Sequence, residues 1–217
     1  MNLQSSPQDS LVMGYLALRK AVGIIGFALP FVLAFGRMLQ QGPGIEGSIS
    51  CYYYTGMRNV LVGSLCAIGV FLLSTRGYDW RDEIAGRLAC VFAIGVAFLP
   101  TNPCMEGVPP HECVAALHRS LAALLFLTLA YFCLALFTKT DPSKIPTRRK
   151  LQRNAVYRAS GYTILACILV IGIVSLPSVN VLVRRCDPIF WLESTAVVAF
   201  GFAWLVKGET ILKDDQP

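Results

Sequence analysis

Charged residues are scarce in this chain. Only 15% of its 217 residues are Asp, Glu, Lys or Arg, whereas 55% are hydrophobic. Soluble domains carry roughly 25% charged residues. The hydrophobic core of one water-soluble domain cannot bury this much apolar sequence. The composition therefore argues against an ordinary soluble domain and favours a polytopic membrane protein.

Histidines and familiar catalytic motifs are scarce as well. The chain has two histidines, His111 and His118, and no H-x-x-x-H or H-E-x-x-H pair, so we expect no metal site. It also lacks a G-x-S-x-G elbow, a phosphate loop, a dinucleotide fingerprint and a haem motif, so no cofactor is predicted. The net charge of +6 is interpreted loop by loop, and no nucleic-acid partner is expected.

Long hydrophobic runs are what the chain does contain. They are continuous rather than alternating, which favours helices over a β-barrel. Most approach the roughly 20 residues that cross a bilayer. The six predicted spans are Tyr15–Phe35, Gly56–Leu73, Ile84–Leu99, Cys113–Phe137, Ser160–Leu176 and Ile189–Val206. We therefore predict an all-α fold, with six transmembrane helices in one bundle over residues 14–208.

The distribution of Lys and Arg predicts the orientation of this bundle. Of the 19 basic residues, five fall on one side of the predicted membrane, namely Arg37, Arg58, Arg119, Arg184 and Arg185. Because Lys and Arg concentrate on the cytoplasmic side, both termini should be cytoplasmic. The predicted localisation is the bacterial inner membrane, with a disordered tail at 1–13 and a second cytoplasmic tail at 209–217. The first span lacks a small-x-small cleavage site, so we expect it to stay uncleaved.

Four cysteines fall on the outer side of this topology, namely Cys51, Cys104, Cys113 and Cys186. An even number on the oxidising side predicts one or two disulfides, with three pairings open. A Cys104–Cys113 bond would close the loop CMEGVPPHEC and leave Cys51 to reach Cys186. The alternative is four free thiols.

Several polar residues lie near the outer ends of different spans. Ionisable groups at membrane depth are costly, so each one invites a functional hypothesis. If these residues converge, they form a pocket open to the outer leaflet or periplasm, with Arg58 and Glu193 as an ion pair. The ligand-binding candidates are Tyr53, Arg58, Asn59, His118 and Glu193. In the alternative interpretation, they lie solvated among the headgroups beside an ordinary aromatic belt.

Several stretches together resemble a known family. The outer-loop Ser48-Ile49-Ser50 leads through tyrosines into RNVLVGSL, the third span ends in AFLPTNP, a histidine opens the fourth, and the chain closes with FWLESTAVVAFGFAWLVKG. This pattern resembles bacterial six-helix membrane proteins of unknown function, loosely akin to the DRAM/Frag/Sfk group. The resemblance implies six helices with cytoplasmic termini and an association with lipid remodelling or trafficking, and it implies no catalytic residue. A resemblance to the ceramidase/progestin-receptor hydrolases fails, because their three histidines and seventh helix are missing.

Three functions are compatible with this sequence. The first is a non-enzymatic protein whose outward-facing pocket binds or senses a membrane lipid or small amphiphilic ligand. The second is a membrane-embedded lipid hydrolase or transferase, with Ser50, His118 and Glu193 as candidate nucleophile, base and orienting acid. The third is a small transporter or channel subunit, whose mostly apolar spans would require a homo-oligomer with a shared pore. No residue is assigned as catalytic from the sequence alone.

Overall fold

The computed structural model describes residues 7–74, 79–102, 111–140, 143, 146–183 and 186–212. These residues form helices and no strand, so the predicted all-α class is confirmed. In chain order the elements are α1 (Pro7–Gln41), the 3₁₀-helix η1 (Ile49–Tyr54), α2 (Arg58–Ser74), α3 (Trp80–Phe98), α4 (Glu112–Tyr131), the π-helical turn η2 (Phe132–Leu136), α5 (Arg148–Val174), α6 (Pro177–Val183) and α7 (Pro188–Lys207).

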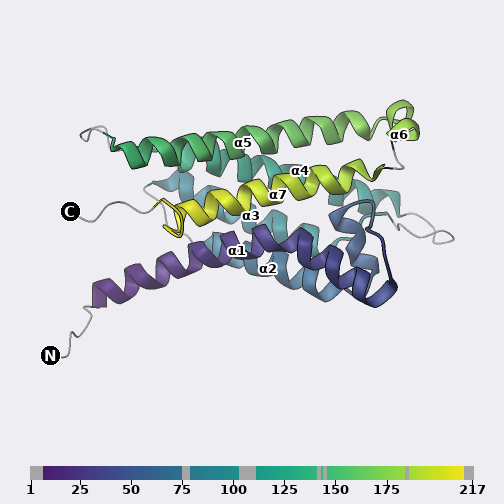
Figure 1. The fold of residues 1–217 in the computed structure, drawn as a ribbon, viewed down its shortest axis with the longest axis horizontal. Coiled ribbons are helices and arrows are strands. Elements are labelled where there is room, and N and C mark those ends of the chain that lie inside the picture. The colour runs from purple at the N-terminus through teal and green to yellow at the C-terminus, as the bar shows by residue number, and fades with distance from the viewer. Residues whose placement is uncertain are drawn as a thin grey trace.

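The long helices lie along the long axis of the molecule and pack as a closed ring (Figure 1). Going round the ring, α1 packs on α2, α2 on α3, α3 on α4, α4 on α5, α5 on α7, and α7 back on α1. The short α6 connects α5 to α7, and α1 begins at the same end of the bundle at which α7 ends (Figure 1). The opposite end holds η1 and α6 and is called the η1 end below.

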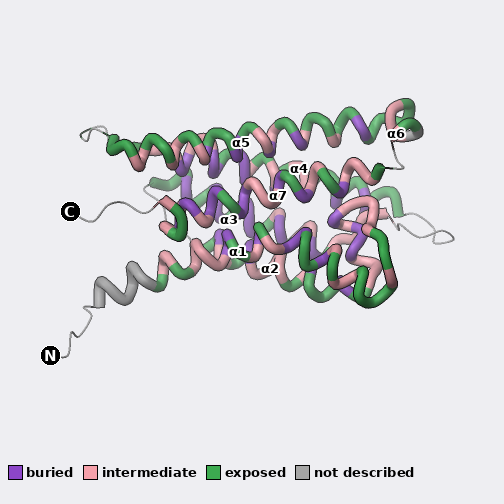
Figure 2. Tube along the Cα trace, viewed as in Figure 1, coloured by how far each residue is buried: buried purple, intermediate pink, exposed green. Residues whose placement is uncertain are grey.

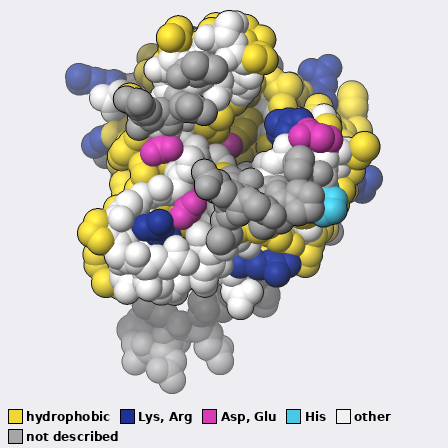
Figure 3. All heavy atoms as spheres, turned by 90° about the vertical axis from the view of Figure 1, so that its right-hand side faces the viewer, with side chains coloured by type: hydrophobic (Ala, Val, Ile, Leu, Met, Phe, Trp, Pro, Cys, Tyr) yellow, Lys and Arg dark blue, Asp and Glu magenta, His cyan; other side chains and the backbone are white. Residues whose placement is uncertain are grey.

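Among the described residues, four helices are long and apolar enough to cross a membrane: 14–41, 112–136, 148–174 and 188–207. The shorter α2 is also apolar, and α3 has 19 residues but carries four charged side chains among its first eight residues. Large apolar side chains face outward along the bundle, where Phe35, Val91 and Leu169 are 65%, 62% and 66% exposed. Exposed stretches cover the outer helix faces in Figure 2, and hydrophobic side chains ring the rim in Figure 3. Exposing so much apolar surface to water would be unfavourable, so this is a membrane protein.

Small residues bring neighbouring helices close together. Ala85, Ala89, Ala93 and Ala97 recur every fourth residue in α3, and all are buried. Where α1 crosses α7, a Cβ atom added to Gly201 would collide with the backbone of Gly23 and Phe27. Such contacts let helix backbones approach in lipid, where dispersion forces and hydrogen bonds replace the hydrophobic effect.

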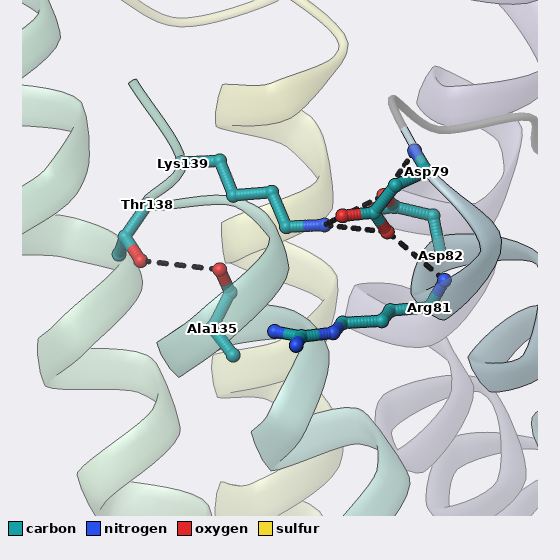
Figure 4. Close-up of polar contacts among 6 residues, drawn as sticks. All are labelled: Asp79, Arg81, Asp82, Ala135, Thr138 and Lys139. Carbon is teal, nitrogen blue, oxygen red and sulfur yellow. Dashed lines mark hydrogen bonds and ion pairs between the residues drawn. The ribbon is translucent and has the colours of Figure 1, made fainter. Parts of the chain in front are cut away.

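The N-terminus of α3 is fixed by a capping box. The side chain of Asp79 accepts from the N–H of Arg81, and that of Asp82 accepts from the N–H of Asp79. Lys139, which follows η2, reaches both carboxylates at 2.8–3.1 Å (Figure 4). The hydrogen bond from Lys139 lowers the pKa of Asp79. Burial lowers the pKa of Lys139, but its bonds to Asp82 and Asp79 outweigh this and raise it overall.

Helical or packed residues continue beyond both predicted limits of the six-helix domain. Residues 7–13, assigned to a disordered tail, form the first turns of α1, because extending an existing helix adds one hydrogen bond per residue. At the other end, the N–H of Thr210 bonds to the carbonyl of Leu205 and Leu212 packs against the core. The structured part of the chain therefore extends beyond the predicted limits of 14 and 208.

Candidate functional site

Within the SISCYYY stretch, the 3₁₀-helix η1 directs the side chains toward two different parts of the bundle. Ser48 caps it by accepting from the N–H of Cys51 at 3.2 Å. Residues three apart eclipse one another in a 3₁₀-helix. Ile49 and Tyr52 are therefore buried together against Phe190, while Ser50 and Tyr53 both face a cavity inside the bundle. Burial of Tyr52 also raises the pKa of its hydroxyl.

His118 in α4 connects this loop to the bundle. The residue is 4% exposed, with Nδ1 of its ring lying 2.6 Å from the carbonyl oxygen of Leu99 and Nε2 lying 2.9 Å from Oγ of Ser50. A carbonyl oxygen can only accept, so Nδ1 carries a proton. In the neutral ring Nε2 is then the acceptor, and the Ser50 hydroxyl donates to it.

The carbonyl of Leu99 is available because α3 ends there. Leu99 is the C-cap, its N–H bonds to Gly95, and Pro100 follows. The last carbonyls of a helix have no partner within it, and a proline stops the helix from continuing. Sequence reasoning missed this contact, although the Leu-Pro pair after an apolar run was the signal for it.

Glu193 in α7 holds η1 from the opposite side. Its Oε2 accepts from the N–H of Ile49 at 2.7 Å, and the N–H of Phe190 bonds to Gly47 in the same loop. The N–H groups at a helix N-terminus lack partners within the helix, so a carboxylate there is favourable. The ring nitrogens of His118 hydrogen-bond to Leu99 and Ser50. The orienting position next to the histidine, which the sequence suggested for Glu193, is therefore taken by a backbone carbonyl.

Two hollows meet at these side chains. The inner cavity, about 60 Å³, is lined mainly by apolar side chains that include Leu29, Leu65, Val96, Leu125, Val197 and Phe200. The outer pocket, about 330 Å³, lies between α4, α5 and α7 and is lined by residues that include Thr101, Arg119, Ile168, Gly172, Ser175 and Ile189. Ser50, His118 and Glu193 line both hollows. The polar groups therefore stand at the junction between a small, mainly apolar space inside the bundle and a larger pocket at its side.

Arg58 and Asn59 do not join this junction. Both are exposed at the start of α2 and line neither hollow. Arg58 lies 4.2 Å from the ring centre of Tyr53 and donates to its hydroxyl. In the described part of the chain no ion pair joins Arg58 to Glu193, because Tyr53 and Ile49 are their partners instead. Arg58 therefore has only an indirect connection to the inner cavity: it contacts Tyr53, and Tyr53 lines that cavity.

A disulfide forms among the four outer cysteines, as the sequence predicted, but the pairing of Cys104 with Cys113 and of Cys51 with Cys186 is wrong. Cys51 is disulfide-bonded, whereas Cys113 and Cys186 are free and exposed. A Cys104–Cys113 bond and a Cys51–Cys186 bond are thus both absent, and Cys104 lies outside the described residues. Loop closure alone could not select the pairing, because the helix packing decides which thiols approach. Among the described residues, no three His, Cys, Asp or Glu side chains cluster as metal ligands.

Comparisons with known proteins add no family to this description. No protein-family model matches the chain, and neither a curated protein nor a solved structure matches it. The resemblance to the DRAM/Frag/Sfk group therefore stays a prediction, and the candidate site rests on its own geometry.

Proposed function

We propose that this protein is a six-span membrane protein that binds a lipid or small amphiphile at its η1 end. One observation carries the proposal: the polar side chains of Ser50, His118 and Glu193 line both an apolar inner cavity and an open outer pocket. A hollow with apolar walls and a few convergent polar groups is typical of a ligand site. An amphiphile matches it, with a polar group at the junction and apolar parts against the walls.

The orientation follows from the basic residues. The end of the bundle where α1 begins carries Arg81, Lys139, Arg148 and Lys207, whereas the η1 end of the described chain carries Arg37, Arg58 and Arg119. Cytoplasmic segments are enriched in Lys and Arg. The termini are therefore cytoplasmic, α2 and α3 complete the six spans, and the η1 end faces the periplasm. In this orientation the ligand comes from the outer leaflet of the inner membrane.

Arg119 favours an anionic headgroup. It follows His118 in α4 and lines the outer pocket but not the inner cavity. Guanidinium groups bind phosphate and carboxylate oxygens through two parallel hydrogen bonds. We therefore expect a lipid with a phosphate headgroup to bind more tightly than a neutral amphiphile of the same chain length.

A transporter is less well supported. The half of the bundle nearer the termini is filled by Phe132, Phe137, Tyr157 and Trp204, whose rings contact one another. All four are buried. This cluster of aromatic rings favours a binding site that opens on one side of the membrane. It does not favour a continuous polar path through the bundle.

Native mass spectrometry of the purified protein tests the proposal. A Cβ atom at Gly172 would meet nothing within 4 Å, so Gly172→Leu should fill the outer pocket without a clash. Gly63 in α2 is equally open and lines neither hollow, so Gly63→Leu is the matched control.

With phosphatidylglycerol supplied in detergent, we expect a lipid adduct on the wild type and on Gly63→Leu. The adduct should fall at least tenfold in Gly172→Leu. A wild type without an adduct, or equal adducts on both variants, would contradict the proposal.

A further inference from the structure

We propose that Ser50 and His118 form a nucleophile–base pair that cleaves a carboxylic ester of a bound membrane lipid. This inference rests on the proposed function, because it takes the bound amphiphile as substrate. It adds the chemical class of that substrate and a reaction for a site otherwise described only by its shape.

The first step of the argument is the direction of the Ser50 proton. Nδ1 of His118 donates to Leu99, which leaves Nε2 to accept from the Ser50 hydroxyl at 2.9 Å. A serine becomes a nucleophile when a base is within hydrogen-bond reach and a third group orients that base. Here the carbonyl of Leu99 is the orienting group, and it fixes the tautomer as a carboxylate does in a Ser-His-Asp triad.

The second step is access. Ser50 lines both hollows, so an ester carbonyl at their junction would meet Oγ directly. The buried ring of His118 lies between η1 and the C-terminal end of α3 and cannot swing away without breaking two hydrogen bonds. The nucleophile therefore faces the ligand space while its base stays within the bundle.

The third step is the position of the Ser50 backbone. Glu193 accepts from the N–H of Ile49, the residue before Ser50, at 2.7 Å. Ser48 caps the same turn. The first contact holds η1 against α7 and the second fixes the turn itself, so Glu193 is a positioning residue and Ser50 and His118 are the catalytic ones.

The reaction balances with water as co-reactant. Oγ of Ser50 forms a bond to the ester carbonyl carbon while Nε2 of His118 takes the hydroxyl proton. The tetrahedral adduct expels the alcohol, which receives that proton, and an acyl group stays on Ser50. Water then attacks the acyl carbon, His118 takes its proton and returns it to Ser50, and a fatty acid leaves. Arg119 lines the outer pocket beside Ser50, so its positive charge would stabilise an oxyanion that develops there.

A purely structural role would use the same hydrogen bonds to tie η1 to α4. A fluorophosphonate probe separates the two roles, because it phosphonylates activated serines and expels fluoride. Ser175 is a matched control, since it lines the outer pocket but donates to the carbonyl of Ile171 instead of a histidine.

In wild-type protein in nanodiscs, we expect the adduct on Ser50 by peptide mass spectrometry. It should be absent in Ser50→Ala, reduced at least a hundredfold in His118→Gln and unchanged in Ser175→Ala. Fatty acid released from phosphatidylglycerol vesicles should follow the same order. Thermal unfolding of each variant shows that it is folded, and Ser50→Cys keeps a nucleophile should Ser50→Ala unfold.

The outcomes separate this inference from the proposed function. A wild type that retains phosphatidylglycerol but shows no adduct on Ser50, or an adduct independent of His118, overturns the chemistry and leaves lipid binding in place. A wild type that retains no lipid overturns both.

Discussion

Nε2 of His118 lies 2.9 Å from Oγ of Ser50, although the two residues are 68 positions apart in the chain. One belongs to α4 and the other to the 3₁₀-helix η1, so the contact joins the segment between α1 and α2 to the interior of a helix ring. Glu193 completes the attachment by binding the backbone next to Ser50. The stability of this loop and the proposed chemistry therefore depend on the same few hydrogen bonds.

Replacing Glu193 tests how firmly α7 holds the loop. Glu193→Ala leaves the N–H of Ile49 without its acceptor, which should cost about 1–3 kcal/mol of unfolding free energy. Glu193→Gln keeps an acceptor oxygen and should cost about 1 kcal/mol, the difference between a charged and a neutral hydrogen bond. Thermal unfolding in detergent measures both, and equal losses would mean that the charge, not the hydrogen bond, matters.

Gly201 should be among the least replaceable residues of the α1–α7 contact. A Cβ atom there would overlap the backbone of α1, which cannot move aside as a flexible side chain can. We expect Gly201→Ala to lower the unfolding free energy by about 1–3 kcal/mol. Gly63→Ala, with open space around it, should be neutral or stabilising by about 0.5–1 kcal/mol. Similar unfolding temperatures for the two variants would argue against the close crossing.

The α3 capping box predicts a pH-dependent stability. Because Lys139 lowers the pKa of Asp79, the folded state favours the carboxylate. This contribution is present above the unfolded pKa of about 4 and is lost as the pH falls through the lower folded value. Lys139→Met should therefore be less stable than wild type near pH 7 and approach it near pH 3. A gap that is constant with pH, measured by thermal unfolding, would contradict this.

Two free thiols allow the orientation to be measured. Cys113 and Cys186 are exposed at the η1 end, whereas Cys90, Cys133 and Cys167 are buried. If that end faces the periplasm, a membrane-impermeant maleimide should label intact spheroplasts, and the Cys113→Ser/Cys186→Ser double variant should lose this labelling. Labelling that requires lysis would place the η1 end in the cytoplasm.

Much of the fold was predictable because it follows from local sequence. Apolar runs such as Ile189–Val206 are long enough to span a bilayer, and a polar backbone in lipid has to satisfy its hydrogen bonds within a helix. The alanine repeat in α3 likewise marked a buried helix face. The ends of the helices were less predictable. For example, α1 begins at Pro7, seven residues before the expected boundary, because helix propagation depends on the turn that it extends.

The candidate site was predictable in part. Ser50, His118 and Glu193 were identifiable because polar groups at membrane depth are rare, and all three line the same hollows. Arg58 was also predicted to lie at membrane depth. In the structure, however, it stacks on Tyr53 and is exposed. Depth along a helix can be read from sequence, but the side of the helix that faces a neighbour cannot.

The sequence by itself determined the class of this protein and the positions of its helices, because length, hydropathy and caps act over a few turns of chain. Only the tertiary structure decided that Leu99 orients His118, that Glu193 binds Ile49, and that Cys113 and Cys186 stay free. These contacts join residues up to 144 positions apart. Their partners are chosen by the order in which helices pack around the ring, and no local pattern encodes that order.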